Sequence, residues 1–485
     1  MTAGQANDKM PWVPMGAVLF GTFMVSLDQT IVTIALPRIG ADLEALDGID
    51  LVMTAYLLAL GVVQPTTGWL ADRFGRKHVF LTSLGIFTIG SLLSGLAADL
   101  PQLVLARILQ GLSGGAIFPV GMAMIYEQVP PGRRGLAMGI WSLALAAAPS
   151  FGPTLGGIIV TTLGWRWLFF VNVPIGIVGV IVGVRVLQFA GFRETRTFDM
   201  VGFGLVTIGL AAALYAVSDA NHAGWASLQT LALGGLGGIL LVAFVVHELR
   251  VPEPLIDVRM FAIPAYSVAM VLVAGMVSVT LARLVFMPLA LVTVRGMSEI
   301  EVGLILTPAA LTGAIAAPLA GVLTDRIGAR VPVVVGLVAM IAGSLLLATL
   351  AIDTSPIAIA VFVGIQGFGN GLALTPNSVA GMNALPQRHL ARGTAIRSTT
   401  RQIAASFSIA LLTAYLVARV GVLGPTDSAE TSGAAQDAIN SIFGICAIVG
   451  VGCLLLAIRL LPHGDEMRRN TRARAAEHED LVGAG

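Results

Sequence analysis

The chain has 485 residues, of which 56% are hydrophobic and only 11% are charged, whereas an ordinary soluble domain carries about 25% charged residues. This composition excludes a water-soluble fold, because such a fold cannot bury that much apolar surface. The net charge of +1 is uninformative until the charges are sorted by loop, and no nucleic-acid partner is expected. The two cysteines, Cys446 and Cys453, lie seven positions apart in one apolar segment, which predicts packing residues and neither a disulfide nor a metal site.

Apolar windows of membrane length recur along the whole chain. A hydrocarbon core needs about 20 apolar residues per helix, and each window should be helical because lipid offers no partner to a free backbone group. The first window is too long for a signal-peptide core, so we interpret it as an uncleaved first span. We predict an all-α integral membrane protein with 14 transmembrane helices, at 13–37, 50–71, 79–98, 102–125, 136–160, 167–188, 199–219, 227–247, 266–291, 300–323, 331–350, 356–378, 395–420 and 437–461.

The charge of the loops predicts the orientation of these spans. One alternating set of loops, together with both termini, carries 20 of the 28 Lys and Arg residues, whereas the opposite set carries four, beside acids such as Asp42 and Glu44. Basic residues concentrate on the cytoplasmic side of membrane proteins. We therefore expect a multi-pass protein of the cell (inner or cytoplasmic) membrane with both termini in the cytoplasm.

An internal repeat divides the chain. Three matches have offsets of 253, 256 and 258 residues: Gly68–Lys77 with Gly321–Arg330, Gln110-Gly111 with Gln366-Gly367, and Arg134-Gly135 with Arg392-Gly393. They predict two six-helix halves related by an axis along the membrane normal, with spans 7 and 8 as an inserted two-helix hairpin. The predicted domains are an N-terminal bundle at 1–190, the inserted helices with their linkers at 191–260, a C-terminal bundle at 261–463 and a cytoplasmic tail at 464–485.

Asp28 is the one carboxylate well inside a predicted span. A charge there costs about 3 kcal/mol or more, so an acid in this position indicates a functional site. Arg107 lies at a depth in span 4 that allows an ion pair with Asp28. Burial favours a neutral acid and a neighbouring cation favours a charged one, and a proton carrier needs this competition. The alternative is a pair that only holds two helices together.

Three more basic residues, Arg283, Arg397 and Arg401, fall within predicted spans. Because Asp28 and Arg107 cancel, three positive charges remain, which favours an anionic or neutral amphipath over a dication as the substrate. The residues that we assign to a substrate cavity are Gln110, Arg283, Arg397 and Arg401. Alternatively, these arginines bond to exposed carbonyls or line a cytoplasmic vestibule.

The pattern at Gly68–Lys77, with its degenerate copy from Gly321, resembles the signature of the major facilitator superfamily, and the resemblance covers nearly the whole chain. It implies a latch that joins the two halves on the cytoplasmic side in the outward-facing state. In this loop Asp72 can accept hydrogen bonds from a helix N-terminus and pair with Arg73 or Arg76. The gate residues implied are Gly68, Asp72, Arg73, Gly75, Arg76, Asp325, Arg326 and Gly328. Alternatively, the basic residues only set the topology.

Further stretches resemble the fourteen-spanner drug/proton antiporter family of the EmrB/QacA type. They are Leu27–Thr30 with Ala35–Pro37, Leu103–Ala116, and Trp165–Trp167 with Asn172–Pro174. Two positions depart from the first two motifs: Thr33 stands where Asn is usual, and Ser113 replaces a common Gly.

Span 5 carries the pattern that the resemblance associates with antiporters, and it alone favours export over uptake. Its residues are Gly139, Gly152, Pro153, Gly156 and Gly157, with Ala148 at one glycine position. Glycines let a neighbouring backbone approach closely, and a proline invites a bend. We interpret 152–157 as a packing surface between the halves; ordinary small-residue helix packing is the alternative.

These patterns predict a proton-coupled efflux transporter that exports hydrophobic or amphipathic compounds by alternating access. No nucleotide-binding motif is present, so the proton is the only coupling ion and no cofactor is expected. The expected partners are small amphipathic substrates and membrane lipid, with a periplasmic adaptor protein as a candidate and a monomer favoured. The alternatives are an exporter or flippase of lipids or fatty acids on the same fold and a non-transporting sensor. An enzyme is not expected, because the six histidines lie in loops or at span ends.

Overall fold

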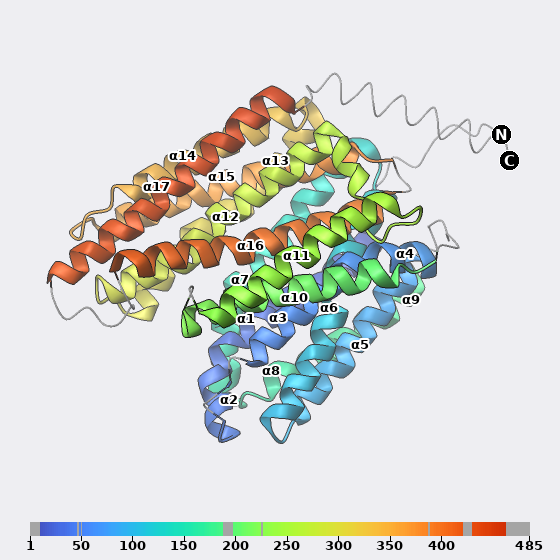
Figure 1. Ribbon diagram of the computed structural model, residues 1–485, viewed down its shortest axis with the longest axis horizontal. Helices are drawn as coiled ribbons and strands as arrows, with labels where there is room; N and C mark the ends of the chain where they lie inside the picture. The colour runs from blue at the N-terminus through green and yellow to red at the C-terminus, as the bar shows by residue number, and fades with distance from the viewer. Residues whose placement is uncertain are drawn as a thin grey trace. The chain divides into compact units, whose positions relative to one another are not determined.

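The computed structural model describes residues 10–45, 48–49, 51–187, 197–224, 227–386, 389–420 and 429–461. Within these ranges every regular element is a helix and no strand occurs, which confirms the all-α class (Figure 1). The predicted tail at 464–485 lies outside the described residues. So does the start of the predicted linker, at 191–196.

The chain separates into two compact units. Unit 1 comprises Met1–Pro130, Ala144–Arg259 and Gln387–Gln402. Its helices, with the short 3₁₀ turns η1 and η2, are α1 (Trp12–Ile31), η1 (Thr33–Ala35), α2 (Leu36–Asp42), α3 (Leu51–Val63), η2 (Gln64–Thr66), α4 (Thr67–Phe74), α5 (Arg76–Leu96), α6 (Leu100–Gln128), α8 (Trp167–Phe170), α9 (Asn172–Val186), α10 (Met200–Ala223) and α11 (Leu228–Arg250).

Unit 2 comprises Pro131–Leu143, Met260–Pro386 and Ile403–Gly485. Two long helices, α7 (Arg134–Thr162) and α16 (Leu390–Val420), are divided between the units at 143/144 and 402/403. The other elements of this part are η3 (Pro131–Arg133), α12 (Pro264–Thr293), α13 (Glu299–Ile327), α14 (Arg330–Ala348), α15 (Pro356–Asn383) and α17 (Ala429–Leu460). The 3₁₀ helix η4 (Val258–Ala262) crosses the boundary between the units at 259/260.

Eleven helices of the described part are long and apolar enough to cross a membrane, and each coincides with a predicted span. Two of them, Leu51–Phe74 and Trp167–Val186, join consecutive shorter elements. The three other predicted spans fall on α1, α7 and α10, which are not among the eleven. The count of 14 spans therefore stays a prediction.

Local breaks shape the helices near Asp28. α1 ends at Ile31, the chain forms the turn η1, and α2 begins with Pro37 in its first turn. Similarly, α8 ends at Phe170 and α9 begins at Asn172, with Pro174 in its first turn. Proline is tolerated there because the first turn of a helix has no partner for its N–H groups. The predicted span at 13–37 therefore contains a 3₁₀ turn, and the span at 167–188 has one irregular position, Val171, which keeps helical dihedral angles.

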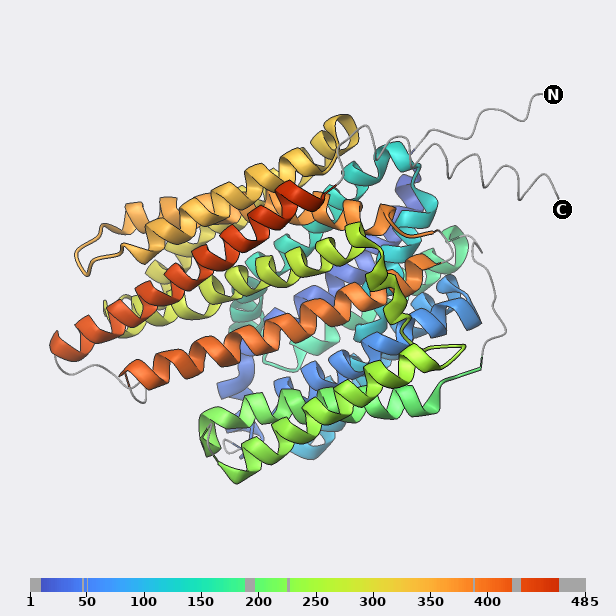
Figure 2. The same cartoon turned by 45° about the horizontal axis from the view of Figure 1, so that its top comes forward.

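The two units repeat one packing device. A Cβ on Gly111 of α6 would collide with the carbonyl oxygen of Tyr56 on α3, and a Cβ on Gly367 of α15 would collide with that of Ala309 on α13. Glycine at these positions lets the two helix backbones touch. The hairpin α10–α11 is placed in unit 1, where α10 also contacts α3 (Figures 1 and 2).

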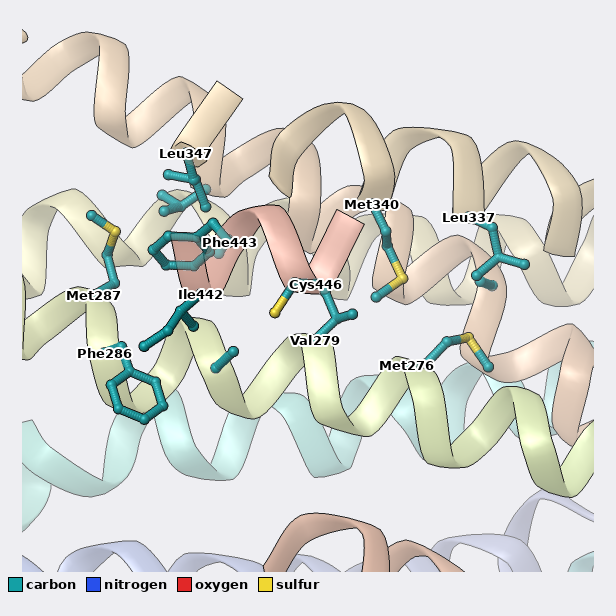
Figure 3. Close-up of a cluster of buried hydrophobic side chains, with 14 of the residues drawn as sticks. Met276, Val279, Phe286, Met287, Leu337, Met340, Leu347, Ile442, Phe443 and Cys446 are labelled. Carbon is teal, nitrogen blue, oxygen red and sulfur yellow. The ribbon is translucent and has the colours of Figure 1, made fainter. Parts of the chain in front are cut away.

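The core of unit 2 is apolar. Side chains of α12, α14 and α17 meet in one buried cluster (Figure 3). Its members in the close-up include Met276, Val279, Phe286 and Met287 of α12, Leu337, Met340 and Leu347 of α14, and Ile442, Phe443 and Cys446 of α17. Cys446 and Cys453 are both free and buried, in agreement with a packing role.

Candidate functional site

A fully buried ion pair lies inside unit 1. Arg107 Nη1 of α6 is 2.6 Å from Asp28 Oδ2 of α1, and both side chains are 0% exposed. Asp28 lies in the last turn of α1, immediately before the helix break. The pair brings together two opposite charges that lipid would not tolerate singly.

The second oxygen of Asp28 is also bound. Asn172 Nδ2, at the start of α9, donates to Asp28 Oδ1 at 3.0 Å and contacts Ser91 Oγ of α5 at the same distance. Ser91 in turn donates to the carbonyl oxygen of Phe169 on α8. The break between α8 and α9 therefore presents both a carbonyl acceptor and an amide donor to one network.

The guanidinium of Arg107 has several further contacts. Nη1 donates to Gln110 Oε1 at 2.9 Å, one turn along α6, and Ser94 donates to the same oxygen at 3.1 Å. The Arg107 Cζ atom lies 4.1 Å from the centre of the Tyr56 ring, where the π-face attracts a cation. Gln110, which we assigned to a substrate cavity, is thus fully buried as a partner of Arg107.

Both oxygens of Asp28 accept hydrogen bonds in this network, as a charged carboxylate does. A proton on Asp28 would neutralise the partner of Arg107 and remove an acceptor from Asn172 or Arg107, so the contacts among α1, α6 and α9 would change. Sequence reasoning missed Asn172, Ser91 and Ser94 as members. The available signal was that each is a polar residue in an apolar span.

The first loop motif ties α4 to the start of α16. Arg392 Nε is 2.9 Å from Asp72 Oδ2, and both side chains are nearly buried. Gly68 makes this approach possible, since a Cβ on it would lie 3.0 Å from Arg392 Cα. Arg392 was noted in the sequence as part of the repeat and for its loop charge, but its pairing with Asp72 was missed.

The other residues of this motif have separate roles. Arg76 Nη1 contacts Glu127 Oε2 of α6 at 2.5 Å, so Arg76 fixes α5 to the end of α6. Gly75 has φ +85° at the end of α4, a conformation that favours glycine. Arg73 is exposed. Asp72 thus pairs with the distant Arg392, and Arg76 pairs with Glu127, which the sequence did not predict.

The second copy of the motif ties α13 to the start of α7 in unit 2. Asp325 Oδ1 and Oδ2 accept hydrogen bonds from the backbone N–H groups of Gly135 and Leu136, at 2.8 and 2.9 Å. These N–H groups belong to the first turn of α7, where a carboxylate is favoured by the unpaired donors and the helix dipole. Gly328 closes α13 with φ +88°, and Arg326 is exposed.

The glycines of α7 pack on different helices. A Cβ on Gly139 would lie 2.7 Å from the carbonyl oxygen of Ala317 on α13. Gly152 packs on Thr30, and a Cβ on Gly156 would lie 3.0 Å from the carbonyl oxygen of Ile31.

Gly152 and Gly156 therefore contact α1, which belongs to the same predicted half as α7. These two glycines therefore do not form the expected surface between the halves. A Cβ on Gly157 would meet no described atom within 4 Å, and the side chain of Pro153 lies outside the described residues.

The three remaining arginines occupy different surroundings. Arg397 Nη1 contacts Met122 Sδ at 3.7 Å within unit 1, and Arg401 is exposed. Arg283 of α12 is 7% exposed, and it has no hydrogen-bond or ion-pair partner among the residues that the structure describes.

A separate polar cluster closes the base of the hairpin in unit 1. His247 Nε2 lies 2.9 Å from Asp199 Oδ1, which also accepts from Gly202 N at 2.8 Å. Glu248 is 0% exposed and accepts from Ile256 N at 3.2 Å. These contacts join the start of α10, the end of α11 and the following linker. In the described residues no group of His, Cys, Asp and Glu could hold a metal ion.

A family model described as the Major Facilitator Superfamily matches residues 18–285 and 268–484. This chain belongs to the major facilitator superfamily. Among superfamily proteins of known fold, the proton:xylose symporter XylE bound to 6-bromo-6-deoxy-D-glucose aligns with a TM-score of 0.66 and 13% identity, over 94% of this chain and 96% of that one. At this identity the likeness shows the superfamily fold alone, a multi-pass helical membrane protein.

Two curated relatives extend the comparison within the superfamily. The tetracenomycin C resistance and export protein of Streptomyces glaucescens is 32% identical over 426 residues, which cover 87% of this chain and 79% of that protein. The multidrug resistance protein Stp of Mycobacterium tuberculosis (strain CDC 1551 / Oshkosh) is 32% identical over 400 residues, covering 82% and 74%.

Proposed function

We propose that this chain is a drug-efflux transporter that exports hydrophobic or amphipathic compounds in exchange for protons. The observation that carries this proposal is the buried Asp28–Arg107 pair, which is closed from water and bonded on both carboxylate oxygens. Burying a carboxylate deep in a membrane helix costs free energy, and such acids are usually functional. The names of the two relatives, a resistance and export protein and a multidrug resistance protein, support the direction and the substrate class.

Alternating access is the proposed transport cycle, with the two loop motifs as its cytoplasmic gate. Two ties support this role. Asp72 of the first sequence repeat holds Arg392 of the second, and Asp325 of the second repeat holds the first turn of α7 in the first. Each tie is a charge-assisted contact that can break and reform as a unit. The exposed Arg73 and Arg326 would then help to set the orientation of the protein in the membrane.

For the membrane topology and the domain organisation, we propose what the sequence predicts. It comprises fourteen spans of the EmrB/QacA type in the cell membrane, with both termini in the cytoplasm, two six-helix halves at 1–190 and 261–463, and an inserted hairpin within 191–260. The matched glycine contacts of α6 on α3 and α15 on α13 support the two halves. The proton would be the only coupling ion, a monomer is favoured, and a periplasmic adaptor protein is one candidate partner.

Transport by purified protein in liposomes tests the proposal. With an acidic lumen, inside-out protein should accumulate an amphipathic substrate against its gradient. Asp28→Asn should abolish this accumulation while retaining binding, because Asn keeps the volume and can keep one hydrogen bond, to Arg107, but cannot titrate. A panel of cationic, neutral and anionic amphipaths identifies the substrate. If Asp28→Asn still concentrates substrate under a proton gradient, the coupling site lies elsewhere.

A second candidate is an exporter or flippase of lipids or fatty acids on the same fold. The buried Arg283, which has no partner among the described residues, favours it, because a negatively charged headgroup would supply the missing charge. Transport of labelled lipid without drug transport would decide for this candidate.

A further inference from the structure

Arg283 is an uncompensated charge in the middle of α12. Its side chain is almost entirely buried, and within the described residues it meets no carboxylate and makes no hydrogen bond. An isolated buried charge is among the most costly features of a protein, and such groups are normally paired. The buried charged residues of unit 1 all have partners or contacts, so Arg283 differs from them.

The internal repeat shows which position Arg283 occupies. The offsets of 253 and 256, of the loop motif and of Gln110, carry Asp28 to Leu281 and Leu284, so Arg283 lies in the turn of α12 that corresponds to Asp28. The offset of 256 that relates Gln110 to Gln366 places Val363, which is fully buried, where Arg107 would be. Unit 2 thus keeps the glutamine of the unit 1 network and has an apolar residue in place of its arginine. It carries a base in the turn that corresponds to its acid. The charge is left without a counter-ion.

Gln366 lies level with Arg283 on the neighbouring helix. α12 and α15 run antiparallel, because Asn377 Nδ2 donates to Ala269 O at 2.9 Å and Thr280 Oγ1 donates to Asn370 Oδ1 at 3.2 Å. Arg283 is one turn beyond Thr280, and Gln366 is one turn before Asn370. These two residues therefore face the same level of the helix pair.

The Gln366 side chain is also incompletely bonded. Its Nε2 donates to Ser344 Oγ at 2.9 Å, but its buried Oε1 has no partner among the described residues. A side-chain amide can rotate to exchange its oxygen and nitrogen, so Gln366 can present two N–H donors to the same space. A buried cation and an adaptable amide at one level are suited to an oxyanion.

We propose that Arg283 and Gln366 bind the oxyanion of an amphipathic substrate, a carboxylate or a phosphate, within unit 2. This rests on the proposed export function and gives it a substrate class. The planar guanidinium can donate two parallel hydrogen bonds to such a group. The apolar body of the ligand would lie along residues of the α12 cluster such as Met287, one turn along α12 from Arg283 (Figure 3).

Binding measurements on the full-length protein test the site. The probes are deoxycholate, a carboxylate amphipath, and its methyl ester, which has the same skeleton without the charge. We expect Arg283→Leu to weaken deoxycholate binding by about tenfold or more and to change ester binding by no more than about twofold. Arg283→Lys should recover part of the deoxycholate affinity. Arg295→Leu, which removes a cation of unit 2 that lies outside the membrane spans, is the matched control.

Thermal stability gives a second readout. Because Arg283→Leu removes an unpaired buried charge, the ligand-free variant should unfold at a higher temperature than the wild type. A lower unfolding temperature together with unchanged deoxycholate affinity would show a structural arginine and overturn the proposal. Equal loss of acid and ester binding would overturn it as well.

The lipid composition of the membrane distinguishes two sources of the oxyanion, a lipid phosphate and an exported carboxylate. Deoxycholate binding is measured in phosphatidylcholine nanodiscs with and without phosphatidylglycerol. Displacement by phosphatidylglycerol supports the site with lipid phosphate as its occupant, and no displacement supports an exported carboxylate. If the wild type binds deoxycholate charge-selectively but shows no proton-driven transport, the proposed export function is contradicted and the oxyanion site is still supported.

Discussion

The amide of Asn172 donates to the carboxylate of Asp28 at 3.0 Å although 144 positions separate them in the chain. The same nitrogen contacts Ser91, so one side chain connects α9 and α5 to the acid on α1. Arg107 binds the other carboxylate oxygen. Asp28 is therefore held from two sides, and its protonation state affects helices that are distant in sequence.

Asn172→Leu should weaken this network without removing the ion pair. The change leaves buried acceptors on Asp28 and Ser91 without a donor, which costs about 1–3 kcal/mol. We expect a lower unfolding temperature and slower proton-driven transport, measured by thermal unfolding and in liposomes. Val173→Leu, at the next position, changes volume but removes no side-chain hydrogen bond and should leave both properties near wild type. Equal effects of the two substitutions would contradict a role of Asn172 in the network.

The pair Asp72–Arg392 should show energetic coupling in transport. Asp72→Asn and Arg392→Gln should each slow the cycle while substrate binding stays within a few-fold, because each breaks a nearly buried charge pair. The double variant should be no slower than either single variant, which a double-mutant cycle of initial transport rates measures. Strictly additive effects would mean that the two residues act independently.

The glycines of α7 should differ in their tolerance of a side chain. Gly156→Leu forces a side chain against the backbone of Ile31 and should cost about 1–3 kcal/mol of stability. Gly157→Leu, one position later, meets no described atom near its Cβ and should be tolerated. Unfolding temperature and protein yield measure the difference. If Gly156→Leu is tolerated, α7 and α1 are not in close contact at this position.

The orientation can be tested with single cysteines on opposite sides of the membrane. Ala41→Cys, in α2, should react with an impermeant maleimide added outside intact cells, whereas Gly132→Cys should react only after permeabilisation, since the basic loops face the cytoplasm. Both positions are exposed. The native Cys446 and Cys453 are buried and should give little background. Reaction of both new cysteines from the same side would overturn the orientation and the count of spans between them.

The sequence was sufficient for properties that depend on local composition. Apolar windows of membrane length predicted the helices, because each helix satisfies its own backbone in lipid regardless of its neighbours. The isolated Asp28 and the repeated loop around Asp72 and Asp325 were visible for the same reason: a charge or a glycine turn stands out against an apolar background. The depth of Arg107 was enough to predict its partner, because helix geometry converts residue number into distance.

Only the tertiary structure decided which side chains meet across helices. Asn172 was visible in a motif, but its contact with Asp28 joins α9 to α1 across 144 positions. The pairing of Asp72 with Arg392, which the sequence did not predict, occurs where the start of α16 approaches Gly68. Gly156 and Gly157 are chemically identical, yet only Gly156 faces a backbone. Such contacts depend on helix rotation and packing, which local sequence does not encode by itself.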